Sequence, residues 1–391
     1  MPYEITLNEI PAGYALSSAR GGGIAKVSVS EFVSSEDGFL FTQRLEGFPS
    51  AIVSQLAKQA TLRPSQVDHM LAIVGSNKKC TVYVNELEIR AEVQGKRSIR
   101  VGELVTDNDI ADIRRVQFEG VEIPNSCGVM FLFSIGWRKG LYYDFWPLQH
   151  GDKRRVRTTD LELLFGQLFT HVIFQDHFRV TDQEWLRLIE KSWFPFISLS
   201  QEIVTSLIGH VRNHWDPDEL VEKIDGEVKS KLDDWLAKWE RVQYLSGHIR
   251  FIRSAVALHR SGDFPGAVAI LFPRLEGILR ELHLEQKLSG KITQQVLAEA
   301  ALSGIDPTTN PRLLMFPEKF GLYLREVFFA NFDGQNPKGV SRNTVCHGVV
   351  RDSEIGAKHS LIGFLILDQL TYYMRPQAAT KAPTTSSSIS Q

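Results

Sequence analysis

The hydrophobic pattern of the chain changes character near residue 150, from a period of two to a period close to 3.6. In the segment LEIRAEV, four apolar residues alternate with three charged ones, which predicts a half-buried strand. The segment VMFLFSIGWRKGLYYDFWPL predicts a hairpin whose turn lies at Arg138-Lys139-Gly140, because Gly140 can adopt a positive φ. Helical patterns at FPSAIVSQLAKQA and TDNDIADIRRV interrupt the strands. We therefore predict a β-rich α+β domain over residues 1–150.

From about residue 156 the pattern is helical throughout. Three segments carry the spacing of a capping box at a helix start: Thr159/Glu162, Thr181/Glu184 and Asp216/Glu219. After the third start, an apolar stripe runs from Leu220 through Trp239 towards residue 260. A further helix begins at Asp263 and contains Pro273, which predicts a kink.

Two more helices are expected near residues 315–330 and 353–373. The last residues, QAATKAPTTSSSISQ, contain little that a core could bury. We therefore predict a helical connector over residues 151–235, a helical bundle over residues 236–375 and a disordered tail over residues 376–391.

Composition limits the classes of function. The 391 residues carry a formal net charge of −2, whereas proteins that coat nucleic acid are strongly basic, so any nucleic-acid contact must be local. Three widely spaced cysteines, Cys80, Cys127 and Cys346, form neither a disulfide framework nor a CxxC pattern. The first residues lack a signal-peptide pattern, and the longest apolar runs are too short to span a bilayer. We expect a cytoplasmic protein that does not enter the membrane.

Three polar patterns have an ordinary structural interpretation beside a functional one. His210 and His214 have a spacing that could bind zinc, but no third ligand follows, and we favour a solvated surface. The triplet of glycines at residues 21–23 lacks the rest of a phosphate-binding loop. A basic run could contact a phosphate backbone, although a solvated loop between domains is the simpler interpretation. Its members are Lys153, Arg154, Arg155 and Arg157. No metal or other cofactor is predicted.

The segment RNTVCHG is the most informative part of the chain. An arginine followed by a histidine five to seven residues later occurs four times: Arg63/His69, Arg241/His248, Arg253/His259 and Arg342/His347. Only the last pair follows a segment rich in helix-breaking residues, which ends in Ser341, a favourable N-cap. Arg342 then falls in the first helical turn, where free amides attract an anion. Asn343 and His347 share a helical face, whereas Arg342 and His347 are about 140° apart around the helix.

RNTVCHG resembles the RNxxxHG signature of a little-characterised family of bacterial and eukaryotic proteins. It also fits the R-x(4–6)-H motif of HEPN domains, helical domains named for nucleotide binding in higher eukaryotes and prokaryotes. The segment GDFPGAVAILFPRLEGILREL is similar to the upstream helix of such domains, with Pro273, Arg274, Leu275 and Glu276 in its P-R-Φ-E part. The resemblance covers roughly residues 240–375 and explains nothing upstream of about residue 235.

The resemblance implies a metal-independent ribonuclease that works as a homodimer. His347 would be the general acid or base, because an imidazole exchanges protons near neutral pH. Arg342 would bind the scissile phosphate, and Asn343 would orient the imidazole or the phosphate. Glu276 would hold Arg342 or polarise His347, and Gly348 would end the helix or admit another backbone.

The alternative is an inactive HEPN-like module for dimerisation or binding of a regulatory protein. In that case Arg342, Asn343 and His347 would cap helices and bond to buried carbonyls, and Cys346 would be a small buried residue. Residues 1–150 would recognise a target or restrain the activity, and by analogy the role would lie in stress or defence.

Overall fold

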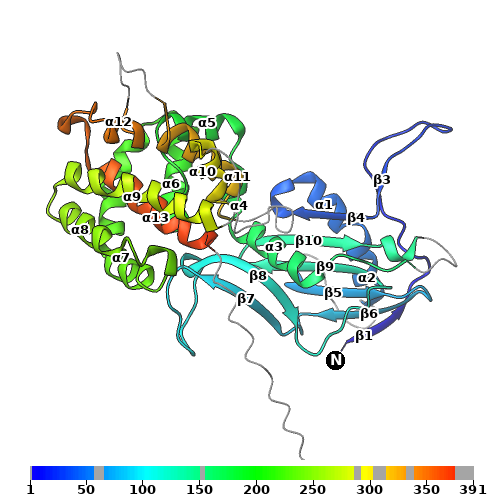
Figure 1. Cartoon of the computed structure of the whole chain (residues 1–391). Coiled ribbons are helices and arrows are strands. Elements are labelled where there is room, and N and C mark those ends of the chain that lie inside the picture. The colour runs from blue at the N-terminus through cyan, green and yellow to red at the C-terminus, as the bar shows by residue number, and fades with distance from the viewer. Residues whose placement is uncertain are drawn as a thin grey trace, which may run out of the picture. The chain divides into compact units, whose positions relative to one another are not determined.

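The computed structural model describes residues 2–56, 66–149, 155–285, 292–302, 314–331 and 339–374. It confirms the α+β class, with an N-terminal sheet and a C-terminal helical region (Figure 1). The chain forms two compact units. The sheet unit comprises Met1–Gln94 and Asp112–Gln175, and the helical unit comprises Gly95–Ala111 and Asp176–Gln391. The predicted tail, residues 376–391, lies outside the described residues.

The sheet unit contains a six-stranded antiparallel sheet with the order β1-β6-β5-β9-β10-β4. Its strands are β1 (Tyr3–Thr6), β4 (Ser30–Ser34), β5 (His69–Val74), β6 (Lys79–Val84), β9 (Gly128–Ile135) and β10 (Arg138–Asp144). Two further pairs join β2 (Tyr14–Ala15) to β3 (Val27–Ser28) and β7 (Ile89–Gly95) to β8 (Ile110–Phe118). The unit's main helices are α1 (Phe39–Leu45), α2 (Phe48–Leu56) and α3 (Leu161–Ile173).

Strand β9 is buried on both faces, which explains its unbroken apolar sequence. Leu132 belongs to the core that includes Phe41 of α1 and Ile52 of α2. On the other face, the rings of Phe131 and Phe165 are 5.2 Å apart, so α3 covers that side. The sheet therefore lies between two helical layers, and its strands position no polar groups of the motif.

Two local predictions in the sheet unit were wrong. The hairpin of β9 and β10 is present, but its turn lies at Gly136, with φ of 60°, and Gly140 is inside β10. A Cβ at Gly140 would approach the Phe133 ring to 2.5 Å, so this glycine provides space. The segment TDNDIADIRRV is a 3₁₀ turn followed by β8, because its β-branched residues pair with β7.

The helical unit consists of nine described α-helices. They are α5 (Asp182–Glu190), α6 (Gln201–Arg212), α7 (Val221–Trp239), α8 (Ile249–Arg260), α9 (Phe264–Glu285), α10 (Gln294–Ala300), α11 (Pro317–Tyr323), α12 (Arg342–Cys346) and α13 (Ala357–Tyr373). The short helix α4 (Gln175–Phe178) lies at the division between the units, and α11 continues into a π-helical turn, Leu324–Phe328. Among the described residues, no helix combines the length and apolar character needed to cross a membrane.

Helix α9 is central to this unit, since α8, α10, α12 and α13 all pack against it. Its buried side includes Leu271, Leu275, Leu279 and Glu276, the last an exception among apolar neighbours. Pro273 lies inside the helix as predicted. Helix α13 is buried along most of its length. The motif helix α12 thus rests on the central helix of the unit.

The helix starts follow the sequence with small differences. Thr181 and Glu184 form the predicted capping box of α5, and Asp216 caps the turn that begins at Pro217. Helix α3 is capped by Asp160, not Thr159, because the Asp160 carboxylate accepts hydrogen bonds from the amides of the first turn. The apolar stripe of α7 stops at Trp239, and α8 is a separate helix.

The units also divide the chain differently from the predicted domains. The segment expected to be a connector, residues 151–235, is divided between the two units, because α3 belongs to the sheet unit and α5 to the helical unit. The division falls after Gln175 because α3 covers the sheet with phenylalanine side chains.

Candidate functional site

The motif segment forms α12, a helix of only five residues. Ser341 is its N-cap: its hydroxyl oxygen accepts a hydrogen bond from the Thr344 amide, and the Thr344 hydroxyl oxygen accepts one from the Ser341 amide. Both residues are buried. The cap therefore satisfies the Ser341 and Thr344 amides within the protein and fixes where the helix begins.

Asn343 is a buried anchor, not an exposed ligand. Its Nδ2 donates to the carbonyl oxygens of Phe329 and Ala330, both at 3.1 Å. Its Oδ1 accepts from Gln294 Nε2 at 2.6 Å and from Arg342 Nη1 at 3.1 Å. The side chain thus ties α12 to α10 and to the end of the π-helical turn, and it positions Arg342. No described contact links it to the His347 ring.

Arg342 lies against the buried carboxylate that the sequence singled out. Its Nε forms an ion pair with Glu276 Oε2, and the two side chains are 22% and 5% exposed. The other oxygen, Glu276 Oε1, accepts from Arg280 Nε at 2.8 Å and lies 2.6 Å from Arg280 Nη2. One buried carboxylate of α9 therefore holds two guanidinium groups, one on each oxygen.

His347 caps the C-terminal end of α12 and is exposed to solvent. Arg342 and His347 lie at opposite ends of the helix, a rise of roughly 7–8 Å along its axis. Gly348 follows with φ of 65°, and no atom lies within 4 Å of a Cβ built there. Gly348 therefore ends the helix through its backbone conformation, and no described segment of this chain approaches it closely.

Cys346 is exposed, contrary to the expectation of a small buried residue. Desolvation raises the pKa of its thiol, Arg342 lowers it and Glu276 raises it. The thiol form is therefore favoured near neutral pH, which argues against a nucleophilic role.

Exposure separates the motif histidine from two of the other arginine–histidine pairs. His248 is buried and bonds Glu281 at 3.0 Å. His259 is fully buried between Ser360 and Asp225. His347 alone among these three histidines is open to solvent, as an acid–base group needs to be. Arg63 of the remaining pair lies outside the described residues.

The contacts of His259 have the composition of a serine–histidine–aspartate triad, but the burial of the group excludes that role. Ser360 Oγ is 2.8 Å from His259 Nδ1, and Asp225 Oδ1 is 3.0 Å from His259 Nε2. Ser360 and His259 are both 0% exposed, and the serine hydroxyl also donates to the Ala357 carbonyl. A substrate cannot reach this serine, so the group fixes α7, α8 and α13 together and is not a hydrolase site.

The basic run has a structural role where it is described. Arg157 is 3% exposed; its Nε donates to Asp144 Oδ2 at 2.5 Å and its Nη2 to the Cys127 carbonyl. It is therefore not available to a phosphate backbone. Arg155 lies over the Trp146 ring at 5.0 Å, and Lys153 and Arg154 lie outside the described residues.

The histidine pair does not form a zinc site. Helix α6 ends at Arg212, and His214 has a left-handed conformation with φ of 60°, so His210 and His214 do not share a helical face. His210 bonds the Ser206 carbonyl. In the described part of the chain, no group of three or more His, Cys, Asp and Glu side chains is arranged to hold a metal ion.

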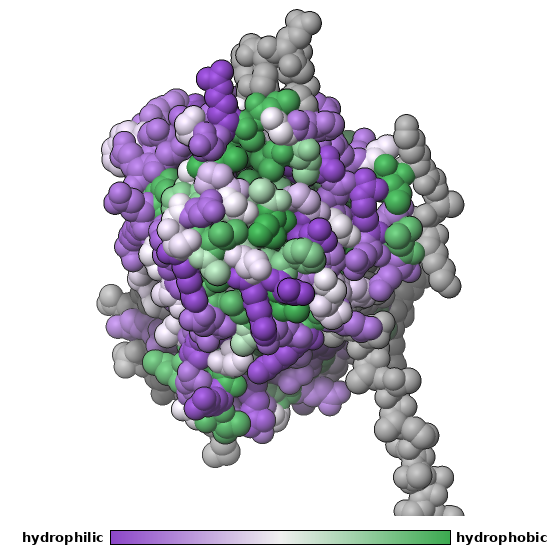
Figure 2. Space-filling model, turned by 60° about the vertical axis from the view of Figure 1, so that its left-hand side comes forward, coloured by the Kyte–Doolittle hydropathy of each residue, from purple (hydrophilic) through white to green (hydrophobic). Residues whose placement is uncertain are grey.

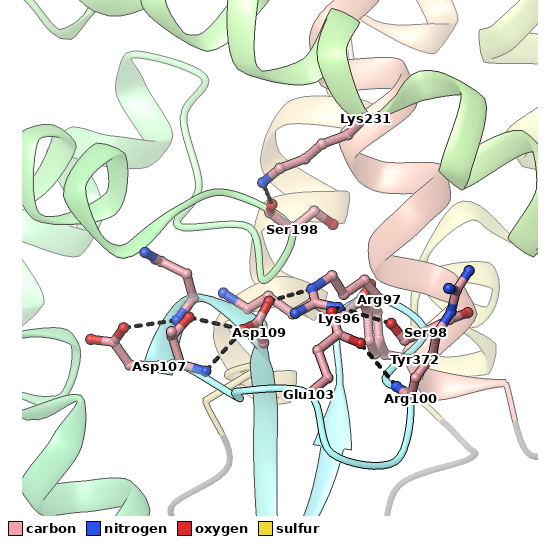
Figure 3. A network of polar contacts seen from close by, with 12 residues as sticks. Lys96, Arg97, Ser98, Arg100, Glu103, Asp107, Asp109, Ser198, Lys231 and Tyr372 are labelled. Carbon is pink, nitrogen blue, oxygen red and sulfur yellow. Dashed lines mark hydrogen bonds and ion pairs between the residues drawn. The ribbon is translucent and has the colours of Figure 1, made fainter.

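A second polar cluster lies in the loop between β7 and β8 (Figure 3). Arg97 bonds both Asp109 and Glu103 at 2.6 Å, and Asp109 also accepts from Thr106. The hydrogen bond from Arg97 lowers the pKa of Asp109 to about 2. Lys96 donates to the Leu199 carbonyl. The charges of Lys96 and Arg97 compensate those of Glu103 and Asp109, so this cluster stiffens the loop. Burial lowers the pKa of Lys96 to about 8.

The pockets of the described residues include one in the sheet unit and one in the helical unit. The larger, about 950 Å³, lies in the sheet unit, and its Arg115 is ion-paired with Asp160 and Glu162. The smaller, about 440 Å³, is lined by Gln294, the partner of Asn343, and by residues of the π-helical turn. The smaller pocket therefore adjoins the motif, and π-helical turns often occur at functional sites.

Sequence reasoning did not identify Arg280 and Gln294. Arg280 was detectable, since Glu276 and Arg280 are four apart on one helix and must lie on one face. Gln294 carried no signal, because its contact with Asn343 joins segments 49 residues apart.

Comparisons of the chain with family models, with curated proteins and with solved structures found no match. The resemblance of residues 240–375 to HEPN domains thus remains a prediction from the motif and its helices.

Proposed function

We propose that the helical unit is a metal-independent endoribonuclease that cleaves single-stranded RNA. The observation that carries the proposal is the combination of an exposed His347 with an Arg342 fixed on a buried carboxylate. Arg342 is the first residue of the five-residue helix α12 and His347 is its C-cap, so their backbone positions are fixed relative to each other.

His347 would remove the proton of a ribose 2′-hydroxyl or protonate the leaving 5′-oxygen. The 2′-oxygen attacks the adjacent phosphorus, the bond from phosphorus to the 5′-oxygen breaks, and the products are a 2′,3′-cyclic phosphate and a 5′-hydroxyl. Arg342 would bind the phosphate and stabilise the charge that develops on it. Neither step requires a redox partner or an added co-reactant.

A second copy of the chain would supply the second acid–base histidine, because each chain has one motif. Exposed apolar side chains on the helical unit are compatible with such an assembly: Leu284, one turn beyond Arg280 on α9, is 64% exposed, and Phe251 of α8 is 42% exposed. Figure 2 shows several apolar groups on the face turned forward, with polar groups between them. The proposal therefore includes a homodimer.

The proposal places the activity in the cytoplasm, in agreement with three free cysteines. Residues 1–150 would recognise the target or restrain the activity, and a role in stress or defence is an analogy with HEPN proteins.

A non-catalytic interaction module is the second candidate. It is favoured by the burial of Ser341, Asn343 and Thr344, whose polar groups form hydrogen bonds within the protein. In that case the motif builds a surface for a protein partner, and His347 performs no proton transfer.

The test is incubation of the full-length protein with end-labelled single-stranded RNA in EDTA. Wild type is compared with His347→Ala and Arg342→Ala. His214→Ala is the matched control for an exposed histidine, and Arg260→Ala, which removes an exposed guanidinium paired with Asp233, is the matched control for the arginine. We expect cleavage by wild type and both controls and its loss in both motif variants.

Absence of cleavage by a folded, dimeric wild-type protein would reject the nuclease and favour the interaction module. Equal cleavage by His347→Ala would also reject it, since another group or a contaminant would then be responsible.

A further inference from the structure

Arg280 is the unexplained charged residue beside the motif. It lies one turn after Glu276 on α9 and is 46% exposed, more than Arg342 at 22%. Its Nε and Nη2 both contact Glu276 Oε1, while Arg342 takes Oε2. A buried carboxylate thus fixes the orientation of two guanidinium groups at the surface.

The charges of these three groups decide what the site can bind. Glu276 and Arg342 by themselves sum to zero, so an isolated pair would attract a phosphate only weakly. Arg280 adds one positive charge, and the three groups then carry a net charge of +1. Because each phosphodiester carries one negative charge, the cluster can neutralise one internal phosphate of a polynucleotide.

The donors that remain also favour an anion. Each guanidinium has five N–H groups in a fixed plane. Arg280 uses its Nε and Nη2, and Arg342 uses its Nε and Nη1, on contacts within the protein. No described residue accepts from Arg280 Nη1 or Arg342 Nη2. Each arginine therefore presents one amino group on a side chain that the protein already holds in place.

We infer that Arg280 is a second phosphate-binding residue of the motif site and that the site takes internal phosphodiesters of a single strand. The inference rests on the proposed function for the identity of the substrate. It adds that Arg342 alone does not bind a phosphate well, because Glu276 neutralises its charge, and that Arg280 supplies the positive charge that is missing.

The test measures binding without cleavage. A fluorescent single-stranded DNA oligonucleotide with a 5′-hydroxyl lacks the attacking 2′-oxygen, and its affinity for full-length protein is measured by anisotropy over a range of salt concentrations. One lost phosphate contact on a single strand reduces the slope of log K against log salt by about 0.7. The same relation gives a loss of affinity of about eightfold near 50 mM salt and about threefold near 200 mM. We expect these changes for Arg280→Ala, with partial recovery in Arg280→Lys.

Arg260→Ala is the control, because it removes a similarly exposed, carboxylate-paired guanidinium on another helix and should leave the slope unchanged. Circular dichroism and thermal unfolding establish that each variant is folded. Wild-type affinity and slope in folded Arg280→Ala would overturn the inference, as would failure of the wild type to bind. Strong preference of wild type for a 5′-phosphorylated oligonucleotide would overturn the assignment to internal phosphodiesters.

The two proposals fail separately. If wild type binds DNA through Arg280 but does not cleave RNA, the nuclease is rejected and the binding residue stands. If RNA is cleaved but Arg280→Ala binds normally, only the role of Arg280 is rejected.

Discussion

Asn343→Ala should destabilise the helical unit far more than His347→Ala, although the two residues belong to the same motif. Asn343 is 5% exposed, and its side chain forms five hydrogen bonds. His347 is exposed and lies at the end of its helix. The comparison therefore separates the structural part of the motif from the part available to a substrate.

The size of the stability loss in Asn343→Ala follows from the polar groups that the substitution leaves without hydrogen-bond partners. The substitution leaves the Phe329 carbonyl without its described partner, whereas the Ala330 carbonyl keeps the Ser341 hydroxyl. It also removes both contacts of Gln294 to α12. Counting only the two bonds to the buried Phe329 and Ala330 carbonyls, at about 1 kcal/mol each, and a penalty of about 1–2 kcal/mol for the Phe329 carbonyl left unpaired, the loss in the free energy of unfolding is about 3–4 kcal/mol. An exposed substitution such as His347→Ala costs less than about 0.5 kcal/mol.

The assay is urea unfolding of both variants followed by far-UV circular dichroism, with the midpoint and slope fitted separately. A loss below about 1 kcal/mol in Asn343→Ala would refute the anchoring role. A comparable loss in His347→Ala would refute the division of the motif into anchor and exposed group.

Two further predictions concern titration and a buried ion pair. Burial is the main cause that lowers the pKa of His359 to about 4, below the value near 6.5 of an unfolded chain. Between pH 6.5 and pH 4, the histidine is therefore protonated in the unfolded state but not in the folded state. The free energy of unfolding should fall by about 3 kcal/mol as the pH drops through this range. Urea midpoints at several pH values check this, and His359→Asn should show a smaller pH dependence; an unchanged profile contradicts the reasoning. Arg157→Ala should destabilise the sheet unit by about 3–5 kcal/mol, because the buried Asp144 loses its ion-pair partner. Thermal unfolding measures this, and a change below about 1 kcal/mol would show that the pair is unimportant.

Local sequence patterns predicted much of the helical unit, because helix starts and apolar stripes are determined by residues close together in the sequence. The capping box at Thr181, the proline start after Asp216 and the apolar stripe of α7 depend on residues within one or two turns. The turn at Gly136 was misplaced because Gly136 and Gly140 both allow a turn, and only the packing of Phe133 against Gly140 distinguishes them. Strand β8 was mistaken for a helix because its pairing with β7 is not written in its own sequence.

The motif shows the same limit at the level of side chains. The sequence correctly places Ser341 at a helix start and Glu276 on the neighbouring helix. It cannot show that Asn343 is buried, because that depends on carbonyls 13 and 14 residues earlier. Equally, Arg157 looks like a solvated cation until the fold brings Asp144 beside it.

The end groups of RNA cut in EDTA test the central claim most directly. Wild-type protein should release fragments with a 2′,3′-cyclic phosphate and a 5′-hydroxyl, and His347→Ala should release none. Fragments with a 3′-hydroxyl, or the same cyclic products from His347→Ala, would contradict the account.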